Sequence, residues 1–159
     1  MSLIVPETDS EWRGYFEAAG AGRLVVRRCA DCGLLRYPPG AGCPWCASLA
    51  WSWDPVSGRG TIYSYEIVVH AVQPGFRDWA PYPVVIVELD EQQGMPTPDD
   101  GLRLVANLLT ADGRPESEER VAIGARVEVA FQRITPEFAL PQFRLSDEPP
   151  RGRLWRFPD

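Results

Sequence analysis

The chain has 159 residues, of which 45% are hydrophobic, so it is long enough to bury the core of one compact domain. No apolar run reaches the roughly 20 residues that cross a bilayer, and the first residues lack the features of a secretory signal, which predicts a cytoplasmic protein without a membrane span. All sixteen basic residues are arginines, and the net charge of −6 falls entirely after residue 60. This negative charge argues against a protein that binds along the phosphate backbone of a nucleic acid.

Residues 1–22 are expected to form an N-terminal helix. Thr8 and Glu11 have the spacing of a capping box, which opens a helix, and Gly20 and Gly22 are suited to its end. Between them, apolar residues recur at helical spacing: Trp12, Tyr15, Phe16 and Ala19. This stripe predicts packing against the rest of the protein, and a surface that docks a partner is the alternative.

Residues 23–57 are predicted to form a zinc ribbon. A short strand at residues 24–28 leads into Cys29-x-x-Cys32, and the second pair, Cys43-x-x-Cys46, follows after ten residues. Each pair turns its thiolates toward one point, and four sulfurs close a tetrahedral coordination sphere. The cysteines therefore predict one structural metal site, with zinc as the metal.

Iron in a rubredoxin-like site is an alternative that the same four ligands allow, and it would support electron transfer. Two disulfides are disfavoured because thiols stay reduced in the cytoplasm. Small residues beside the cysteines permit the tight turns that the site needs: Ala30, Gly33 and Ala47. Pro44 stiffens the second turn by fixing its own φ.

Residues 58–146 are predicted to form a barrel of about five strands, at residues 61–69, 84–89, 102–108, 126–131 and, more weakly, 142–145. No helical pattern separates them, which favours an antiparallel OB-fold. Residues 147–159 are expected to be a loosely attached tail, which Trp155 and Phe157 could pin to the body. The predicted fold class is mainly β, with an N-terminal helix, a rubredoxin-like zinc ribbon and a C-terminal OB-fold barrel.

Residues that could act together in catalysis are missing from the sequence. His70 is the single histidine, and no cysteine lies outside the two pairs, so a Cys–His nucleophilic pair is not expected. Neither a nucleophile-elbow serine motif nor a phosphate-binding glycine loop is present. No catalytic residue is predicted, and His70 is interpreted as an ordinary exposed or hydrogen-bonded side chain.

Four arginines lie on or beside the predicted ribbon: Arg27, Arg28, Arg36 and Arg59. A solvated face is the simpler interpretation of this cluster. Binding of the phosphates of a nucleotide-bearing ligand is the alternative, because guanidinium groups pair bidentately with phosphate oxygens.

The order of these motifs resembles that of domain-of-unknown-function family 35. After the aromatic stripe come Cys29-x-x-Cys32-Gly33, Tyr37-Pro38-Pro39, Cys43-Pro44-x-Cys46 and Trp53. Ser57-Gly58-x-Gly60-Thr61, Pro81-Tyr82-Pro83-Val84 and Pro141-x-Phe143-Arg144 follow in the family's order. The resemblance covers almost the whole chain, from about Trp12 to Arg144.

This resemblance implies a helix, a rubredoxin-like zinc ribbon and an OB-fold in a protein that accompanies enzymes of acyl-CoA metabolism. Family members bridge subunits of thiolase-superfamily enzymes or acyl-CoA hydratases and help to hold CoA thioesters. The four cysteines match one for one, so the metal role carries over. Gly40 departs from the arginine that the family often has after the double proline, and the loop at residues 91–101 looks longer and more acidic than usual.

Three functions follow from these observations. The leading one is a non-catalytic accessory subunit of a hetero-oligomer that supports a thiolase-like or hydratase-like enzyme acting on acyl-CoA, in lipid or steroid side-chain metabolism. A module that binds single-stranded nucleic acid is the runner-up, since Tyr63 and Tyr65 would share one face of a strand and could stack on bases. A rubredoxin-like electron carrier is the third.

Overall fold

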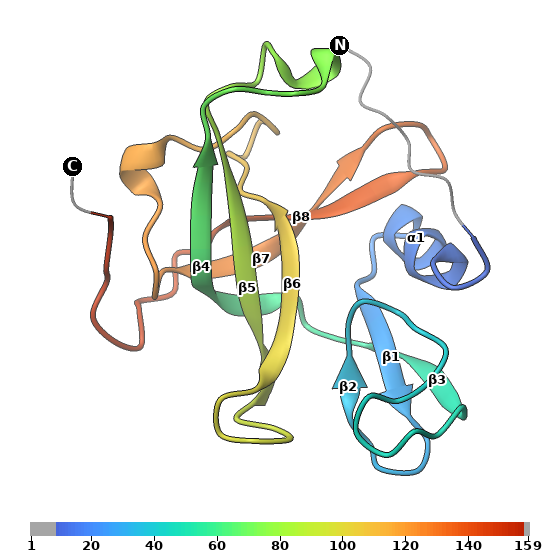
Figure 1. Cartoon of the computed structure of the whole chain (residues 1–159). Helices are drawn as coiled ribbons and strands as arrows, with labels where there is room; N and C mark the ends of the chain where they lie inside the picture. The colour runs from blue at the N-terminus through green and yellow to red at the C-terminus, as the bar shows by residue number, and fades with distance from the viewer. Residues whose placement is uncertain (1–8, 158–159) are drawn as a thin grey trace.

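The computed structural model describes residues 9–157. In chain order its elements are α1 (Arg13–Gly20), β1 (Val25–Cys29), β2 (Leu35–Arg36), β3 (Trp51–Pro55), β4 (Arg59–Val68), η1 (Pro74–Phe76), β5 (Tyr82–Gln93), β6 (Gly101–Asn107), η2 (Glu118–Arg120), β7 (Arg126–Arg133) and β8 (Ala139–Leu145). Figure 1 shows α1 and the three short strands β1–β3 beside a barrel built from the later strands. Across residues 9–157, none of the helices has the length and apolar character needed to cross a membrane.

A turn capped by Asp9 precedes α1. The Asp9 carboxylate accepts hydrogen bonds from the backbone N–H groups of Glu11 (2.9 Å) and Trp12 (3.1 Å). These bonds satisfy donors that the first turn of a helix leaves unpaired. The predicted capping box starts at Thr8, which lies outside the described residues, and the helix itself begins only at Arg13.

Glycines set both the end of α1 and its contact with the ribbon. Gly22 has φ +73°, a left-handed conformation that glycine adopts without strain, and it ends the helix as predicted. Gly14 lies against the indole of Trp53, and a Cβ added at Gly14 would lie only 2.3 Å from Trp53 Nε1. The absent side chain therefore lets α1 approach β3 closely.

The ribbon is a three-stranded antiparallel sheet with the order β2-β1-β3. In its register, Arg27 on β1 lies opposite Arg36 on β2 and opposite Trp53 on β3. The strand predicted at residues 24–28 is thus confirmed, one residue further along the chain. It ends at Cys29, so the sheet delivers this cysteine to the first metal-binding turn.

The barrel is a five-stranded sheet with the order β6-β5-β4-β7-β8, all of it antiparallel. A parallel bridge between Leu108 and Phe143 brings its two edges together and nearly closes it. This is the pattern of an OB-fold, and all five predicted barrel strands are confirmed. The β5 strand runs on to Gln93, into the segment predicted to be a loop, so β5 and β6 form one long hairpin.

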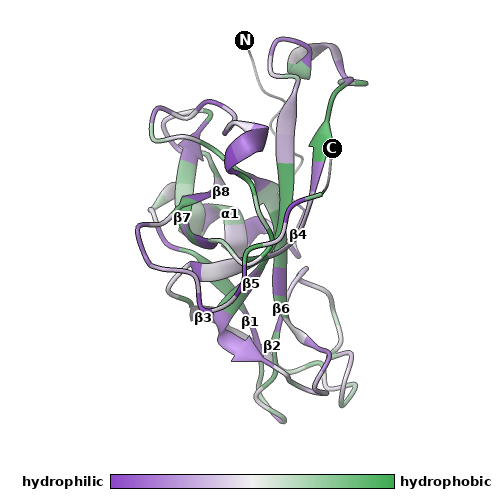
Figure 2. Ribbon diagram, turned by 90° about the vertical axis from the view of Figure 1, so that its left-hand side faces the viewer, coloured by the Kyte–Doolittle hydropathy of each residue, from purple (hydrophilic) through white to green (hydrophobic). Residues whose placement is uncertain are grey.

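One apolar core runs through both the barrel and the ribbon. Strand β5 alternates between buried and less buried residues, and Val85, Val87 and Leu89 are completely buried. Figure 2 shows green apolar stretches along the barrel strands. The same cluster contains residues of α1 and the ribbon: Tyr15, Leu24, Val26 and Leu35. The ribbon is therefore packed against the barrel rather than attached to it by a linker alone.

A bulge in β4 separates the two tyrosines that were expected to share one face. The register with β5 shifts between Ile62 and Ser64, so Tyr63 is the extra residue. Tyr63 is exposed and lies beneath the Arg103 guanidinium, 3.8 Å from its ring, whereas Tyr65 packs against the core. The predicted pair of stacking tyrosines is therefore wrong, because period-two alternation breaks at the bulge.

The C-terminal tail is fastened to the barrel at the two predicted aromatic residues. Trp155 and Ile123 exchange backbone hydrogen bonds of 2.8 and 3.0 Å. The N–H of Phe157 donates to the Tyr65 hydroxyl (3.0 Å), and their rings pack edge to face. Within the described residues the tail is therefore pinned at both aromatic residues, as the sequence allowed, and it is not the loosely attached segment that was expected.

Candidate metal centre

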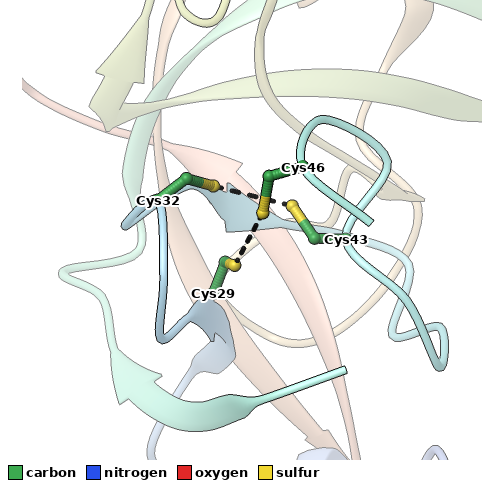
Figure 3. Close-up of side chains that lie close together, drawn as sticks. All are labelled: Cys29, Cys32, Cys43 and Cys46. Atoms are coloured by element: carbon green, nitrogen blue, oxygen red, sulfur yellow. Dashed lines mark hydrogen bonds between the residues drawn. The ribbon is translucent and has the colours of Figure 1, made fainter. Parts of the chain in front are cut away.

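The first cysteine pair lies in a tight turn at the end of β1. The N–H of Gly33 donates to the Cys29 carbonyl (3.0 Å), and the N–H of Cys29 donates to the Leu34 carbonyl (2.9 Å). Gly33 has φ +76°, as the sequence predicts for a small residue at this place. The turn brings the sulfurs of Cys29 and Cys32 to the same side of the ribbon (Figure 3).

The second pair repeats this turn. The N–H of Ala47 donates to the Cys43 carbonyl (2.9 Å), and the N–H of Cys43 donates to the Ser48 carbonyl (2.8 Å). Ala47 occupies the position that Gly33 has in the first turn, with φ +61°. Because an alanine in this conformation is strained by about 1–2 kcal/mol, the second turn needs stabilisation from elsewhere. Metal coordination by Cys43 and Cys46 would supply it.

The four sulfurs converge in a space that fits one metal ion. Cys29 Sγ lies 3.5 Å from Cys46 Sγ, Cys32 Sγ lies 3.7 Å from Cys43 Sγ, and all four lie within 4.8 Å of one another (Figure 3). Tetrahedral zinc with Zn–S bonds of about 2.3 Å requires sulfurs about 3.8 Å apart. The donor set of four thiols therefore fits zinc, and it leaves no coordination position for water or substrate.

The backbone prepares two of the thiols for metal binding. The N–H of Cys32 lowers the pKa of the Cys29 thiol to about 6, against the opposing effect of burial and with help from the N–H of Asp31. Burial raises the pKa of the Cys43 thiol, but the N–H groups of Cys46 and Trp45 bring it below the usual range.

The other two thiols are shifted in the opposite direction. The N–H of Ser48 lowers the pKa of the Cys46 thiol, but the Cys29 sulfur and burial raise it to about 12. The N–H of Leu34 lowers the pKa of the Cys32 thiol, but burial and the Cys29 sulfur raise it above its usual value. Thiolates are the form that binds metal, so loading the ribbon releases the protons that these two thiols hold.

Arg27 on β1 is buried against two tryptophans of the neighbouring strand β3. Its guanidinium lies 3.7 Å from the Trp51 ring and 5.2 Å from the Trp53 ring. Its Nη1 donates to the Gly40 carbonyl (2.6 Å) and forms an ion pair with Glu11 (2.5 Å). Arg27 thereby connects α1 to the ribbon.

The prediction that the four arginines form one solvated face is wrong for two of them. Arg27 and Arg36 are buried, with 1% and 6% of their surface exposed. Arg28 and Arg59 are on the surface, where Arg28 pairs with Asp54 and Arg59 lies 3.8 Å from Glu148. The burial of Arg27 was missed because the pattern of residues along β1 does not show that two tryptophan rings of β3 cover this side chain.

An apolar groove of about 510 Å³ lies between α1 and the barrel. Most of its lining is aromatic or aliphatic: Trp12, Tyr15, Phe16, Tyr37, Phe76, Tyr82, Val84, Val105, Ala106, Leu140 and Pro141. Burial raises the pKa of Tyr15 and Tyr37, so both stay neutral phenols. The aromatic stripe of α1 was the signal in the sequence, and its predicted packing is confirmed, since Tyr15 lies in the core and Trp12 and Phe16 pack against it while they also line the groove. The alternative, a surface that docks a partner, stays a prediction.

Two side-chain amides form a polar spot in this groove. The backbone N–H of Asn107 donates to Gln142 Oε1 (2.7 Å), and Gln142 Nε2 donates to the Asn107 side-chain oxygen, Oδ1 (3.4 Å). Nothing in the sequence pattern identified these amides, because they come from strands far apart in the chain. His70 lies on the surface, outside both the groove and the cysteine cluster.

The fold and the cysteine cluster define a protein that joins a rubredoxin-like zinc ribbon to an OB-fold. A family model described as the ChsH2 rubredoxin-like zinc ribbon domain matches residues 16–52, and one described as the ChsH2 C-terminal OB-fold domain matches residues 53–132. The chain belongs to this ChsH2 family, which is also named DUF35.

Three curated relatives show how such chains occur in larger and smaller proteins. A probable enoyl-CoA hydratase alpha subunit of Thermomonospora curvata is 39% identical over 82% of this chain. A 3-oxo-4,17-pregnadiene-20-carboxyl-CoA hydratase alpha subunit of Mycobacterium tuberculosis is 29% identical over 82% of this chain. The chain spans only 36% of the length of each of these two proteins. A DUF35 domain-containing scaffold protein of Methanothermobacter thermautotrophicus is 33% identical, with 84% of this chain and 88% of that protein aligned.

A solved structure described as the Ltp2-ChsH2(DUF35) aldolase contains a chain with the same fold. It superposes with a TM-score of 0.72 and is 37% identical, and the alignment covers 89% of this chain and 98% of that chain. The likeness therefore includes the helix, ribbon and barrel together, not the barrel alone.

Proposed function

We propose that the chain is a non-catalytic accessory subunit that binds a thiolase-superfamily enzyme acting on acyl-CoA substrates. The observation that carries this proposal is the 37% identity, over 89% of this chain, with a chain of the Ltp2-ChsH2(DUF35) aldolase. The coverage of 98% of that chain leaves almost no part of the relative without a counterpart here. The scaffold-protein name of a relative of similar length supports a role in assembly.

The metal site supports a structural rather than a chemical contribution. In this proposal Cys29, Cys32, Cys43 and Cys46 hold one zinc ion, and the ion crosslinks the turn after β1 to the turn before β3, with only the two-residue strand β2 between them. The helix (residues 1–22), the ribbon (23–57), the barrel (58–146) and the tail (147–159) then act as one docking unit. The chemistry belongs to the partner enzyme.

The acyl-CoA assignment draws support from the relatives and from the groove. Two hydratase alpha subunits with CoA thioesters in their names are similar to this chain over 82% of its length. The groove beside α1 has an apolar wall and the amide pair of Asn107 and Gln142, a combination that suits the apolar part of a thioester. A lipid or steroid acyl chain is the ligand class that we assign to it.

The runner-up, binding of single-stranded nucleic acid, has less support in the structure. The two tyrosines proposed as a stacking platform lie in different environments, and Tyr65 is covered by Phe157. The chain also has a net charge of −6. Both features work against a groove that attracts phosphates and stacks bases.

Co-purification tests the proposal. The full chain, carrying a tag, is co-expressed in turn with thiolase-like and hydratase-like enzymes of its own organism, and any complex is isolated by affinity and size-exclusion chromatography. A stable complex is expected, and the Cys43→Ser variant should lose it along with its zinc. Recovery of the tagged chain alone, or capture of a hydratase-like enzyme but never a thiolase-like one, would contradict the proposed partner.

A further inference from the structure

An exposed aromatic cluster lies where the C-terminal tail runs against β4. The centre of the Phe157 ring lies 5.0 Å from that of Tyr65, on β4, and 4.8 Å from that of Trp155. The backbone N–H groups of both tail residues are hydrogen-bonded to the rest of the chain, yet 44% of Trp155 and 55% of Phe157 stay exposed. Tryptophan, tyrosine and arginine are the residues that carry most of the energy of protein interfaces. Rings that are held in place but left in water therefore indicate a surface that another protein covers.

Two exposed arginines accompany this cluster. Arg156 lies between the two tail aromatics in the chain, and Arg153 lies before them. The Arg153 carbonyl lies against Gly124, whose N–H donates to the carbonyl of Ile62 (2.9 Å), so this arginine is level with the first half of β4. Within residues 9–157 neither arginine forms an ion pair, so an outside partner can use the charge of both.

Two exposed glutamates lie on the opposite side of the cluster, further along β4. Glu118 and Glu119 form the start of η2 and border a small cavity that Ile67 also lines. Ile67 follows Tyr65 by two residues, so both face the same side of β4 and the cavity lies next to the aromatic cluster. In Figure 1, η2 (orange) and the end of the tail (dark red) lie on the same side of β4. Neither glutamate forms an ion pair with a residue of the described chain.

We propose that this surface binds a second copy of the chain in a symmetric dimer. Along β4 the arginines come first, the aromatic rings follow, and the glutamates come last. A two-fold axis through the rings would therefore place the arginines of each copy against the glutamates of the other, which pairs both sets of charges at once. The rings of the two copies would pack together at the centre of the interface and exclude water. The surface, named the tail patch, consists of Tyr65, Glu118, Glu119, Arg153, Trp155, Arg156 and Phe157.

The dimer does not depend on the thiolase-like partner, so it is tested on the zinc-loaded full chain by itself. Sedimentation velocity is measured over a series of protein concentrations from low to high micromolar. We expect a reversible shift from one chain to two chains as the concentration rises. A wild-type protein that stays monomeric at the highest concentration would overturn the proposal.

Charge reversal tests the symmetric pairing. One variant carries Arg153→Glu and Arg156→Glu, and another carries Glu118→Arg and Glu119→Arg. Thermal unfolding first confirms that both variants are folded, as expected for substitutions at four exposed side chains. Each variant should be monomeric alone, because like charges would meet across the axis. An equimolar mixture should form dimers again, because each copy then meets opposite charges on the other. The proposal is rejected if either variant dimerises like the wild type, or if their mixture stays monomeric.

Matched controls place the same kinds of change elsewhere. Arg13→Glu with Arg23→Glu reverses two exposed arginines beside α1 that form no ion pair within residues 9–157, and this variant should dimerise like the wild type. Trp155→Ala removes a ring from the centre of the tail patch and should raise the dissociation constant of the dimer by about tenfold or more. Val72→Ser, at a side chain that is 93% exposed between β4 and β5, should leave it unchanged. Equal dissociation constants for these two variants, or loss of the dimer in the arginine control, would reject the tail patch as the interface.

Discussion

The side-chain amide of Gln92 pairs with the backbone of Leu35 in the way that a neighbouring strand would. The N–H of Leu35 donates to Gln92 Oε1 (2.9 Å), and Gln92 Nε2 donates to the Leu35 carbonyl (2.7 Å). Both residues are buried, although 57 positions separate them in the chain. Strand β2 of the ribbon is thereby hydrogen-bonded to the long β5–β6 hairpin of the barrel.

Replacing Gln92 with methionine should destabilise the protein by about 1–3 kcal/mol, because a buried N–H and a buried carbonyl of Leu35 would lose their partners. Urea unfolding measures the change. Gln93→Met at the adjacent exposed position is the matched control and should change stability by less than about 0.5 kcal/mol. Equal stabilities for the two variants would show that the amide pairing contributes little.

Alanine at Gly14 should weaken the docking of α1 on the ribbon. Alanine is a better helix former than glycine by about 1 kcal/mol, which alone predicts stabilisation. The new Cβ would lie 2.3 Å from Trp53 Nε1, however, and overpacking costs about 1–3 kcal/mol. We expect net destabilisation in thermal unfolding. Glu17→Ala, at an exposed place on the same helix, should be close to neutral, and a Gly14→Ala protein more stable than wild type would refute the close approach.

The ion cluster around Arg126 should make stability depend on acid pH. Arg126 donates to both Asp90 oxygens (2.8 and 2.6 Å), and this contact lowers the pKa of Asp90. The ion pair therefore adds its full contribution to the free energy of unfolding at pH values above about 3.9, the pKa of an aspartate in the unfolded chain. This contribution disappears as the pH falls through the lower pKa that Asp90 has in the folded protein. At pH 7, Asp90→Asn should cost about 1–3 kcal/mol.

The stability difference between wild type and Asp90→Asn should shrink between about pH 5 and pH 2. Denaturant unfolding at a series of pH values measures it. The surface variant Asp99→Asn is the control, since its side chain makes no ion pair within residues 9–157. A difference that stays constant down to pH 2 would contradict the assigned ion pair.

Removal of the metal should unfold the ribbon before the barrel. Structural zinc contributes on the order of 10 kcal/mol to small modules, whereas the barrel has its own buried strands, β4 to β8. Elemental analysis should find one zinc per chain and none in Cys43→Ser. Hydrogen exchange after chelation should show lost protection in β1 and β2 and retained protection in β5. Visible absorption of the isolated protein would instead identify iron.

Much of this architecture could be predicted from the sequence because its determinants are local. The spacing of the cysteines specifies the two turns, and β-branched runs with intervening proline and glycine specify the barrel strands. Gly22 and Gly33 have the left-handed conformations that their places in the pattern require. The ring contact of Phe157 with Tyr65 also followed from the apolar character of Phe157, whereas Trp155 is held by backbone bonds to Ile123.

Features that depend on distant residues could not be predicted in this way. The buried position of Arg27 requires two tryptophans from β3 and a glutamate from before α1. The β4 bulge, which separates Tyr63 from Tyr65, depends on the pairing with β5. In the sequence, Gln92 looks like a polar residue of an acidic loop. Its role, pairing with the backbone of Leu35, exists only because the β5–β6 hairpin lies beside the ribbon. The groove likewise exists only where α1 meets β6 and β8.

The most direct test of the accessory role is a turnover measurement with purified components. A thiolase-like enzyme that co-purifies with this chain is assayed with its CoA thioester alone, with the zinc-loaded chain, and with Cys43→Ser, and the zinc-loaded chain is also assayed by itself. We predict no turnover by the chain alone, and a turnover by the enzyme that rises at least tenfold when the zinc-loaded chain is added but not when Cys43→Ser is added. Turnover by the isolated chain, or an enzyme whose rate is the same with and without it, would contradict the account.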